Sequence, residues 1–164
     1  MSTPVSELEG VLATLIIEHR RLLRQLIAQH DAMETMDLKA IESATAQQEA
    51  LRLRIATLEN RRQTVTAQLA APLRVTPPIT LLRLIDALPR PQQPTLRRQR
   101  DELRTVMQEI SRNAGNSGRL AGAVLGYLNT AVRLLNGAIQ RSGVYTRQGL
   151  SRATPRLGVM DAVG

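Results

Sequence analysis

The sequence predicts an all-α fold, an elongated antiparallel three-helix bundle of the coiled-coil type with a flexible C-terminal tail. Apolar residues recur at alternating steps of four and three over long stretches, and a proline-rich segment separates the second stretch from the third. The 164 residues include no Trp, no Phe and only two Tyr, so the core has to be aliphatic, which suits packed helices better than a β-sandwich. We expect residues 1–141 to form the bundle and residues 142–164 the tail.

The first helix is predicted over residues 4–34. Thr3 is a suitable N-cap, and Pro4 suits the first helical position. The stripe along this helix consists of Leu8, Leu12, Leu15, His19, Leu22, Leu26, Gln29 and Met33. A second line of Ile16, Leu23 and Ile27 widens the stripe, which indicates packing against two partner helices.

The second helix is predicted over residues 37–70, with Asp37 as N-cap. Its stripe consists of Ile41, Ala44, Gln48, Leu51, Ile55, Leu58, Arg62, Val65 and Leu69. Gln48 and Arg62 are polar interruptions that could set the register against the first helix. The short link between the two helices predicts an antiparallel hairpin.

A proline-rich linker is predicted over residues 71–94, because proline cannot donate to the helical ladder and restricts the residue before it. Within the linker, residues 80–88 have the pattern of a short helix. A third long helix is predicted over residues 95–140, with Thr95 as its cap. Residues 113–118 (Asn-Ala-Gly-Asn-Ser-Gly) are poor helix formers apart from Ala114, but Ile110 and Leu120 share one stripe only if the helix runs through them.

Catalysis finds little support in the sequence, and we expect a protein that is not an enzyme and holds no cofactor or metal. Without Cys, a thiolate site is excluded, and His19 and His30 are too far apart along one helix to share a metal ion. The position of His19 in the stripe indicates a packed, hydrogen-bonded side chain. Residues 113–118 lack the Gly-Lys-Ser/Thr ending of a phosphate-binding loop.

The positive charge lies in one half of the chain. Residues 1–82 hold nine basic and nine acidic side chains, whereas residues 83–164 hold thirteen arginines and five acids, the entire net charge of +8. A basic half can serve nucleic acid, an anionic membrane or an acidic protein. Acids interrupt the basic stretch 97–104 and no aromatic platform accompanies it, which favours a solvated helix face over nucleic-acid binding.

Membrane insertion is not expected, because the wholly apolar runs extend over only a few residues. The first residues also lack the basic flank and apolar stretch of a secretory signal. We therefore expect a cytoplasmic protein.

The chain resembles the FlgN family of flagellar type III export chaperones. The most specific motifs of this resemblance are C-terminal: Asn113-x-x-Asn116-x-x-Arg119-Leu120, then Leu128, then Val144-Tyr145-x-x-x-Gly149. Glu18 in a Leu-rich helix and Leu58-Glu-x-x-Arg62 are also similar to the family. Val144-Tyr145 is followed by Thr-Arg-Gln, which departs from the Gly/Asp-rich run of proteobacterial members.

The resemblance implies a cytoplasmic chaperone for the hook–filament junction (hook-associated) proteins. Such a chaperone binds the terminal helices of these proteins, prevents premature assembly and delivers them to the export apparatus. The resemblance also implies that the C-terminal part binds the substrate. Two alternatives stay open: a basic coiled-coil protein that binds nucleic acid, and a structural coiled-coil scaffold.

Apolar residues at helical spacing, followed by a segment that folds on contact, suit the capture of an amphipathic helix. The expected partner-binding residues are Val124, Tyr127, Leu128, Leu134, Leu135, Ile139, Val144, Tyr145 and Leu150. The expected residues for electrostatic steering of an acidic partner are Arg133, Arg141, Arg147 and Arg152. For Leu120 and Val124, a position in the hydrophobic core is as good an interpretation as partner binding. For Tyr145 and Leu150, the alternative is a tail that binds no partner.

Overall fold

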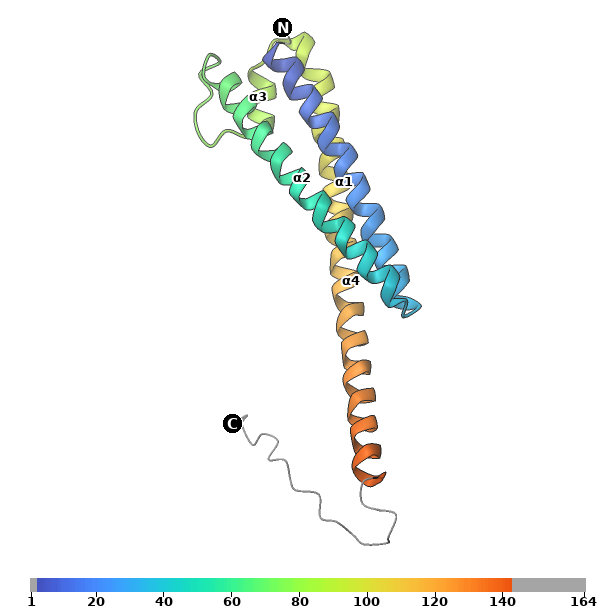
Figure 1. Cartoon of the computed structure of the whole chain (residues 1–164). Helices are drawn as coiled ribbons and strands as arrows, with labels where there is room; N and C mark the ends of the chain where they lie inside the picture. The colour runs from blue at the N-terminus through green and yellow to red at the C-terminus, as the bar shows by residue number, and fades with distance from the viewer. Residues whose placement is uncertain (1–2, 143–164) are drawn as a thin grey trace. The chain divides into compact units, whose positions relative to one another are not determined.

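The computed structural model describes the backbone of residues 3–142 and the side chains of residues 3–122. All regular secondary structure in this part of the chain is helical, which confirms the predicted all-α class. The elements are α1 (Pro4–Glu34), α2 (Leu38–Ala70), α3 (Leu81–Ala87), a 3-10 turn (Arg90–Gln92) and α4 (Gln93–Ser142) (Figure 1). The predicted tail lies outside the described residues.

The helices α1 and α2 form an antiparallel hairpin (Figure 1). Thr3 caps α1, since its hydroxyl accepts a hydrogen bond from the Ser6 amide at 3.3 Å. Between the helices, Met36 adopts a left-handed conformation with φ of 56°. Asp37 then caps α2 by accepting from the Ala40 amide at 3.0 Å. The tight turn and the two caps bring the stripes of the two helices face to face.

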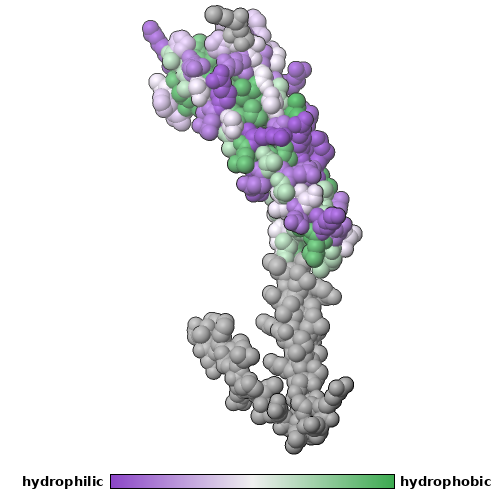
Figure 2. Space-filling model, in the orientation of Figure 1, coloured by the Kyte–Doolittle hydropathy of each residue, from purple (hydrophilic) through white to green (hydrophobic). Residues whose placement is uncertain are grey.

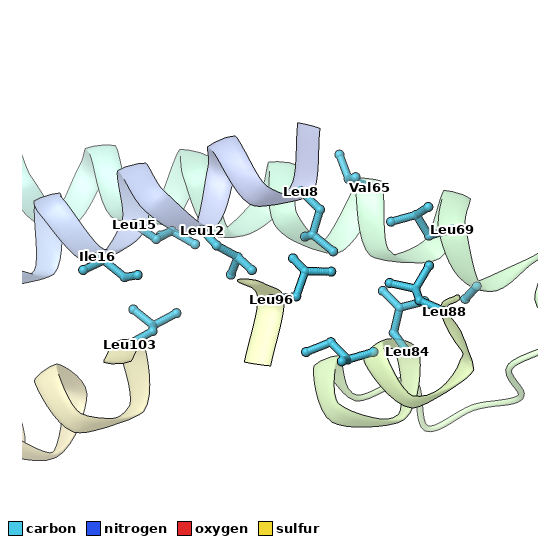
Figure 3. Close-up of a cluster of buried hydrophobic side chains, with 12 residues drawn as sticks. Leu8, Leu12, Leu15, Ile16, Val65, Leu69, Leu84, Leu88, Leu96 and Leu103 are labelled. Atoms are coloured by element: carbon cyan, nitrogen blue, oxygen red, sulfur yellow. The ribbon is translucent and has the colours of Figure 1, made fainter. Parts of the chain in front are cut away.

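Polar and apolar side chains alternate over the outer face of the packed helices (Figure 2). The apolar stripes meet beneath this surface in two core clusters, and the larger one draws on all four helices (Figure 3). Its buried members are Leu8, Leu12, Leu15, Ile16, Val65, Leu69, Ala70, Leu84, Ile85, Leu88, Leu96 and Leu103. Burial of a leucine side chain contributes about 1.5–3 kcal/mol, so this aliphatic cluster is the main source of stability.

The short helix α3 closes one end of the hairpin with Leu84 and Ile85 in the core. Thr80 caps it by accepting from the Arg83 amide at 3.2 Å. The helix α4 begins at Gln93, two residues before the predicted start. The reason is that Pro94 falls in the first turn of the helix, where its missing N–H has no intrahelical partner to lose.

The helix α4 continues through residues 113–118, where the sequence left open whether it breaks. Ser117 is buried and Leu120 half-buried, whereas Gly115 and Gly118 are exposed. The stripe therefore keeps its phase through the segment. The Asn113 side-chain amide donates a hydrogen bond to the Glu109 carbonyl at 2.9 Å, within the same helix.

The chain divides into two units, Met1–Ala121 and Gly122–Gly164. The packed helices belong to the first unit, in which α4 runs alongside α1. There the Gln99 side chain donates to the Glu9 carbonyl at 3.1 Å, and Arg20 pairs with Glu102. Of the second unit, the structure describes the last stretch of α4, and the proposed division between bundle and tail at residue 141 stays a prediction.

Candidate functional site: a groove between α2 and α4

A groove of about 940 Å³ lies between α2 and α4. A smaller hollow of about 320 Å³ continues it and shares His19, Ile55, Glu59 and Met107 with it. The groove exists because α2 packs along α1, while the polar contacts of α4 in the bundle are made with α1 and α3. The side between α2 and α4 is thereby left open.

Aliphatic side chains form the floor of the groove. Leu22 of α1 and Leu103 of α4 are buried there, and Ile55 of α2 and Ile110 of α4 are half-buried. Met107 of α4 is 51% exposed, although it lies one helical turn from the buried Leu103. The groove is thus an incompletely covered extension of the core.

An ion pair within α2 lines the middle of the groove. Arg62 donates from Nε to Glu59 Oε2 at 2.8 Å and from a second nitrogen to the other carboxylate oxygen. These hydrogen bonds lower the pKa of Glu59 and raise the pKa of Arg62. Arg62 therefore interrupts the apolar stripe of α2 by pairing within its own helix.

His19 lines the groove from α1. Its Nδ1 lies 2.8 Å from the Leu15 carbonyl oxygen, which can only accept, so Nδ1 is the donor. The ring is partly buried and hydrogen-bonded, as expected from its place in the stripe. The described residues hold no cluster of three or more metal-ligating side chains.

Arginines stand on both walls of the groove. Arg52 of α2 and Arg104 of α4 are exposed, and neither forms an ion pair within the described residues. Arg100, also on the α4 wall, pairs with its neighbour Asp101 at 2.7 Å. Because Arg62 compensates Glu59, the side chains that line the groove carry a net positive charge.

The groove was not anticipated from the sequence, which placed His19 and Ile55 in the core stripes and Arg104 in a solvated basic stretch, and which assigned no role to Arg52 or Met107. Met107, which directly follows the buried Val106, is the one signal that would have suggested a wider apolar face on α4.

Three residues of the predicted family motif lie among the described side chains. Asn113 bonds within α4, Asn116 is exposed and Leu120 is half-buried. None of them lines the groove. Further along α4, only the backbone of the following predicted site residues is described: Val124, Tyr127, Leu128, Arg133, Leu134, Leu135, Ile139 and Arg141. The predicted site residues outside the described residues altogether are Val144, Tyr145, Arg147, Gly149, Leu150 and Arg152.

None of the helices described here combines the length and the apolar character that a membrane crossing requires. Comparison with curated proteins and with solved structures yields no match. The FlgN protein family, in contrast, matches residues 1–153, which is nearly the whole chain. This family consists of flagellar export chaperones and is not a family of enzymes. The chain therefore belongs to the FlgN family and has the general role of a chaperone for flagellar export substrates.

Proposed function

We propose that this protein is a cytoplasmic chaperone that binds the terminal helices of hook–filament junction proteins. In this role it keeps those proteins from assembling prematurely and delivers them to the flagellar export apparatus. The observation that carries the proposal is the family match over residues 1–153, which includes the predicted substrate-binding end of the chain.

The pattern of α4 supports the proposal. Its backbone is helical to Ser142, and apolar residues recur at helical spacing along its last stretch, from Val124 to Ile139. The following segment adds Val144, Tyr145 and Leu150. A stripe of this kind can cover the apolar face of an amphipathic helix. A segment that becomes ordered on binding loses conformational entropy, which keeps the affinity moderate and permits release at the export apparatus.

The charge of this end supports an acidic partner. Arg133, Arg141, Arg147 and Arg152 are accompanied by a single acid after residue 110, Asp161. Such an excess accelerates encounter with an acidic terminal helix and makes the association rate depend on salt.

The decisive experiment measures binding of junction-protein C-terminal peptides to two forms of the chain by calorimetry. Deletion of residues 142–164 is expected to abolish capture while leaving the helical circular dichroism of the bundle largely unchanged. A finer test replaces both Tyr145 and Leu150 by Ala, with T146A/S151A as the matched control. Full binding by the deletion variant would exclude the tail as the substrate site.

The nucleic-acid alternative is tested with the same protein. It predicts binding to duplex DNA that weakens steeply with salt, because each neutralised phosphate releases counterions. Absence of a mobility shift with DNA at low salt would exclude it. In the basic stretch at the start of α4, Arg97 pairs with Asp86 and Arg100 pairs with Asp101. These ion pairs support the interpretation of the stretch as a solvated helix face.

A further inference from the structure

The groove between α2 and α4 has the features of a second docking surface. We propose that it binds an amphipathic helix of a partner protein that carries acidic side chains on both sides of its apolar stripe. All residues of this groove belong to the first unit, so the proposal can be tested independently of what the C-terminal segment binds.

The floor of the groove is incompletely buried. Leu103 is buried, but Ile55 and Ile110 are only half-buried and Met107 is 51% exposed. A helix laid over these side chains would remove further apolar surface from water, which is favourable by about 25 cal/mol per Å². The flexible thioether of Met107 can adapt to different apolar partners.

The groove has the length of a short helix. Its α4 wall extends from Arg100 to Ser111, and its α2 wall from Arg52 to Arg62. At about 1.5 Å per residue, each wall is roughly 15 Å long, which matches three turns of a partner helix. With α4 seated against α1, a helix in the groove would take the place of the fourth helix in a four-helix bundle.

Positive charge lies on both walls of the groove. Arg52 and Arg104 flank the floor from opposite walls without ion pairs among the described residues, whereas Glu59 is compensated by Arg62. Acidic side chains on both flanks of a docked helix would meet these two guanidinium groups. The alternative occupants fit less well, because the same face of a second copy is equally positive, and a nucleic acid would leave the apolar floor uncovered.

The test uses a fluorescein-labelled 18-residue helical peptide with a leucine stripe flanked by Glu, and the same peptide with Lys in place of Glu. Anisotropy titrations with the full chain should give saturable binding of the Glu peptide and at least tenfold weaker binding of the Lys peptide. Equal affinities for both peptides, or no binding of the Glu peptide, would overturn the proposal.

Matched variants locate the site. The double substitution R52E/R104E should weaken the Glu peptide about tenfold or more, because two attractive charges become repulsive. The control R90E/R98E changes two exposed arginines outside the groove and should stay within about twofold of the native affinity. R52E/R104E binding within twofold of native would contradict the proposal.

The apolar floor is tested by M107D, with L53D as control because Leu53 is 63% exposed on α2 and does not line the groove. We expect a loss of at least tenfold only for M107D, and equal losses for both would contradict the groove. Circular dichroism verifies that each variant is folded, and R52E/R104E, which changes only exposed side chains, carries the test if M107D unfolds.

Two further outcomes separate this proposal from its competitors. The full-length Y145A/L150A variant should bind the Glu peptide with native affinity, and loss of that binding would assign the peptide to the C-terminal segment instead. Concentration-dependent dimerisation that M107D abolishes would identify a second copy as the occupant and overturn the proposal. Neither result depends on whether the C-terminal segment captures junction proteins.

Discussion

Gln48 of α2 donates a hydrogen bond from Nε2 to the side-chain oxygen of Gln29 in α1, at 3.0 Å. The same nitrogen lies 3.3 Å from the Gln25 carbonyl, and Gln29 in turn donates to the Thr45 hydroxyl at 2.8 Å. Gln48 is only 5% exposed, so this polar layer lies within an otherwise aliphatic seam. It couples the two helices of the hairpin at one register, because a shift along the axis would bury the amide without a partner.

Removal of this amide should destabilise the hairpin. We expect Q48A to lower the free energy of unfolding by about 1–3 kcal/mol, since it leaves a gap and removes the partner of the Gln29 oxygen. Urea denaturation followed by circular dichroism measures the loss. Q47A, at an exposed neighbouring position, is the control and should change stability by less than about 0.5 kcal/mol. Equal effects of the two substitutions would show that the polar layer has no energetic role.

The Glu59–Arg62 pair predicts a pH-dependent contribution to stability. The pKa of Glu59 lies below its ordinary value of 4.5, chiefly because Arg62 donates to the ionised carboxylate. Ionised Glu59 therefore stabilises the fold above pH 4.5, and this contribution is lost as the pH falls through the lowered pKa. At pH 7, E59Q should be less stable than the native chain by about 0.5 kcal/mol, a small figure because solvent screens the 40% exposed side chain.

The measurement is a series of urea denaturations of native chain and E59Q from pH 7 downward. The difference between them should shrink towards zero once native Glu59 is protonated. E49Q is the control, because Glu49 is exposed on the same helix and has no ion pair within the described residues. A difference that persists unchanged at the lowest pH would refute the electrostatic origin.

The turn between α1 and α2 contains a residue with backbone strain that a substitution can relieve. Met36 has a φ of 56°, which costs a residue with a Cβ about 1 kcal/mol, and its side chain is 38% exposed. M36G should therefore raise the free energy of unfolding by about 0.5–1 kcal/mol. E34G, at the last residue of α1, should have the opposite effect by about 1 kcal/mol, because glycine is a poor helix former. Thermal melts of both variants provide the comparison, and destabilisation by M36G would contradict the left-handed conformation.

Gly118 weakens α4 without a local steric reason. A Cβ built at this position meets no atom within 4 Å, and the residue lies within the continuous helix. G118A should therefore stabilise the protein by about 1 kcal/mol, and A114G, at an exposed position one turn earlier, should destabilise it by a similar amount. Circular dichroism melts measure both changes. An unchanged or lowered melting temperature of G118A would indicate a close contact at this position.

Local patterns in the sequence were sufficient for the bounds of α1 and α2, whereas α4 begins two residues before the predicted cap Thr95. The caps at Thr3 and Asp37 form as expected, because each needs only a side-chain oxygen and an amide three residues further on. The continuity of α4 through residues 113–118 likewise follows from the phase of Ile110 and Leu120. The partner role of Gln48 was anticipated as a register element, whereas Arg62 pairs within its own helix.

Contacts between segments far apart in the sequence could not be predicted from local patterns. Glu18 is only 6% exposed, and it is compensated by Arg21 at 2.6 Å and by Arg54 of α2 at 4.0 Å. Glu18 lies three residues after Leu15 and four before Leu22, so its spacing places it on the buried face of α1, but the spacing does not show which side chain of α2 compensates the carboxylate.

The sequence by itself determined the all-α class, the aliphatic core and the family, since periodicity, capping residues and C-terminal motifs are local properties of the chain. The tertiary structure alone decided that α4 lies against α1 and leaves the side towards α2 open. The physical reason is that a stripe on α4 specifies which face is buried but not which neighbour buries it. That choice follows from side-chain packing and from long-range pairs such as Arg20–Glu102, and it brings Arg52, Met107 and Arg104 together around one groove.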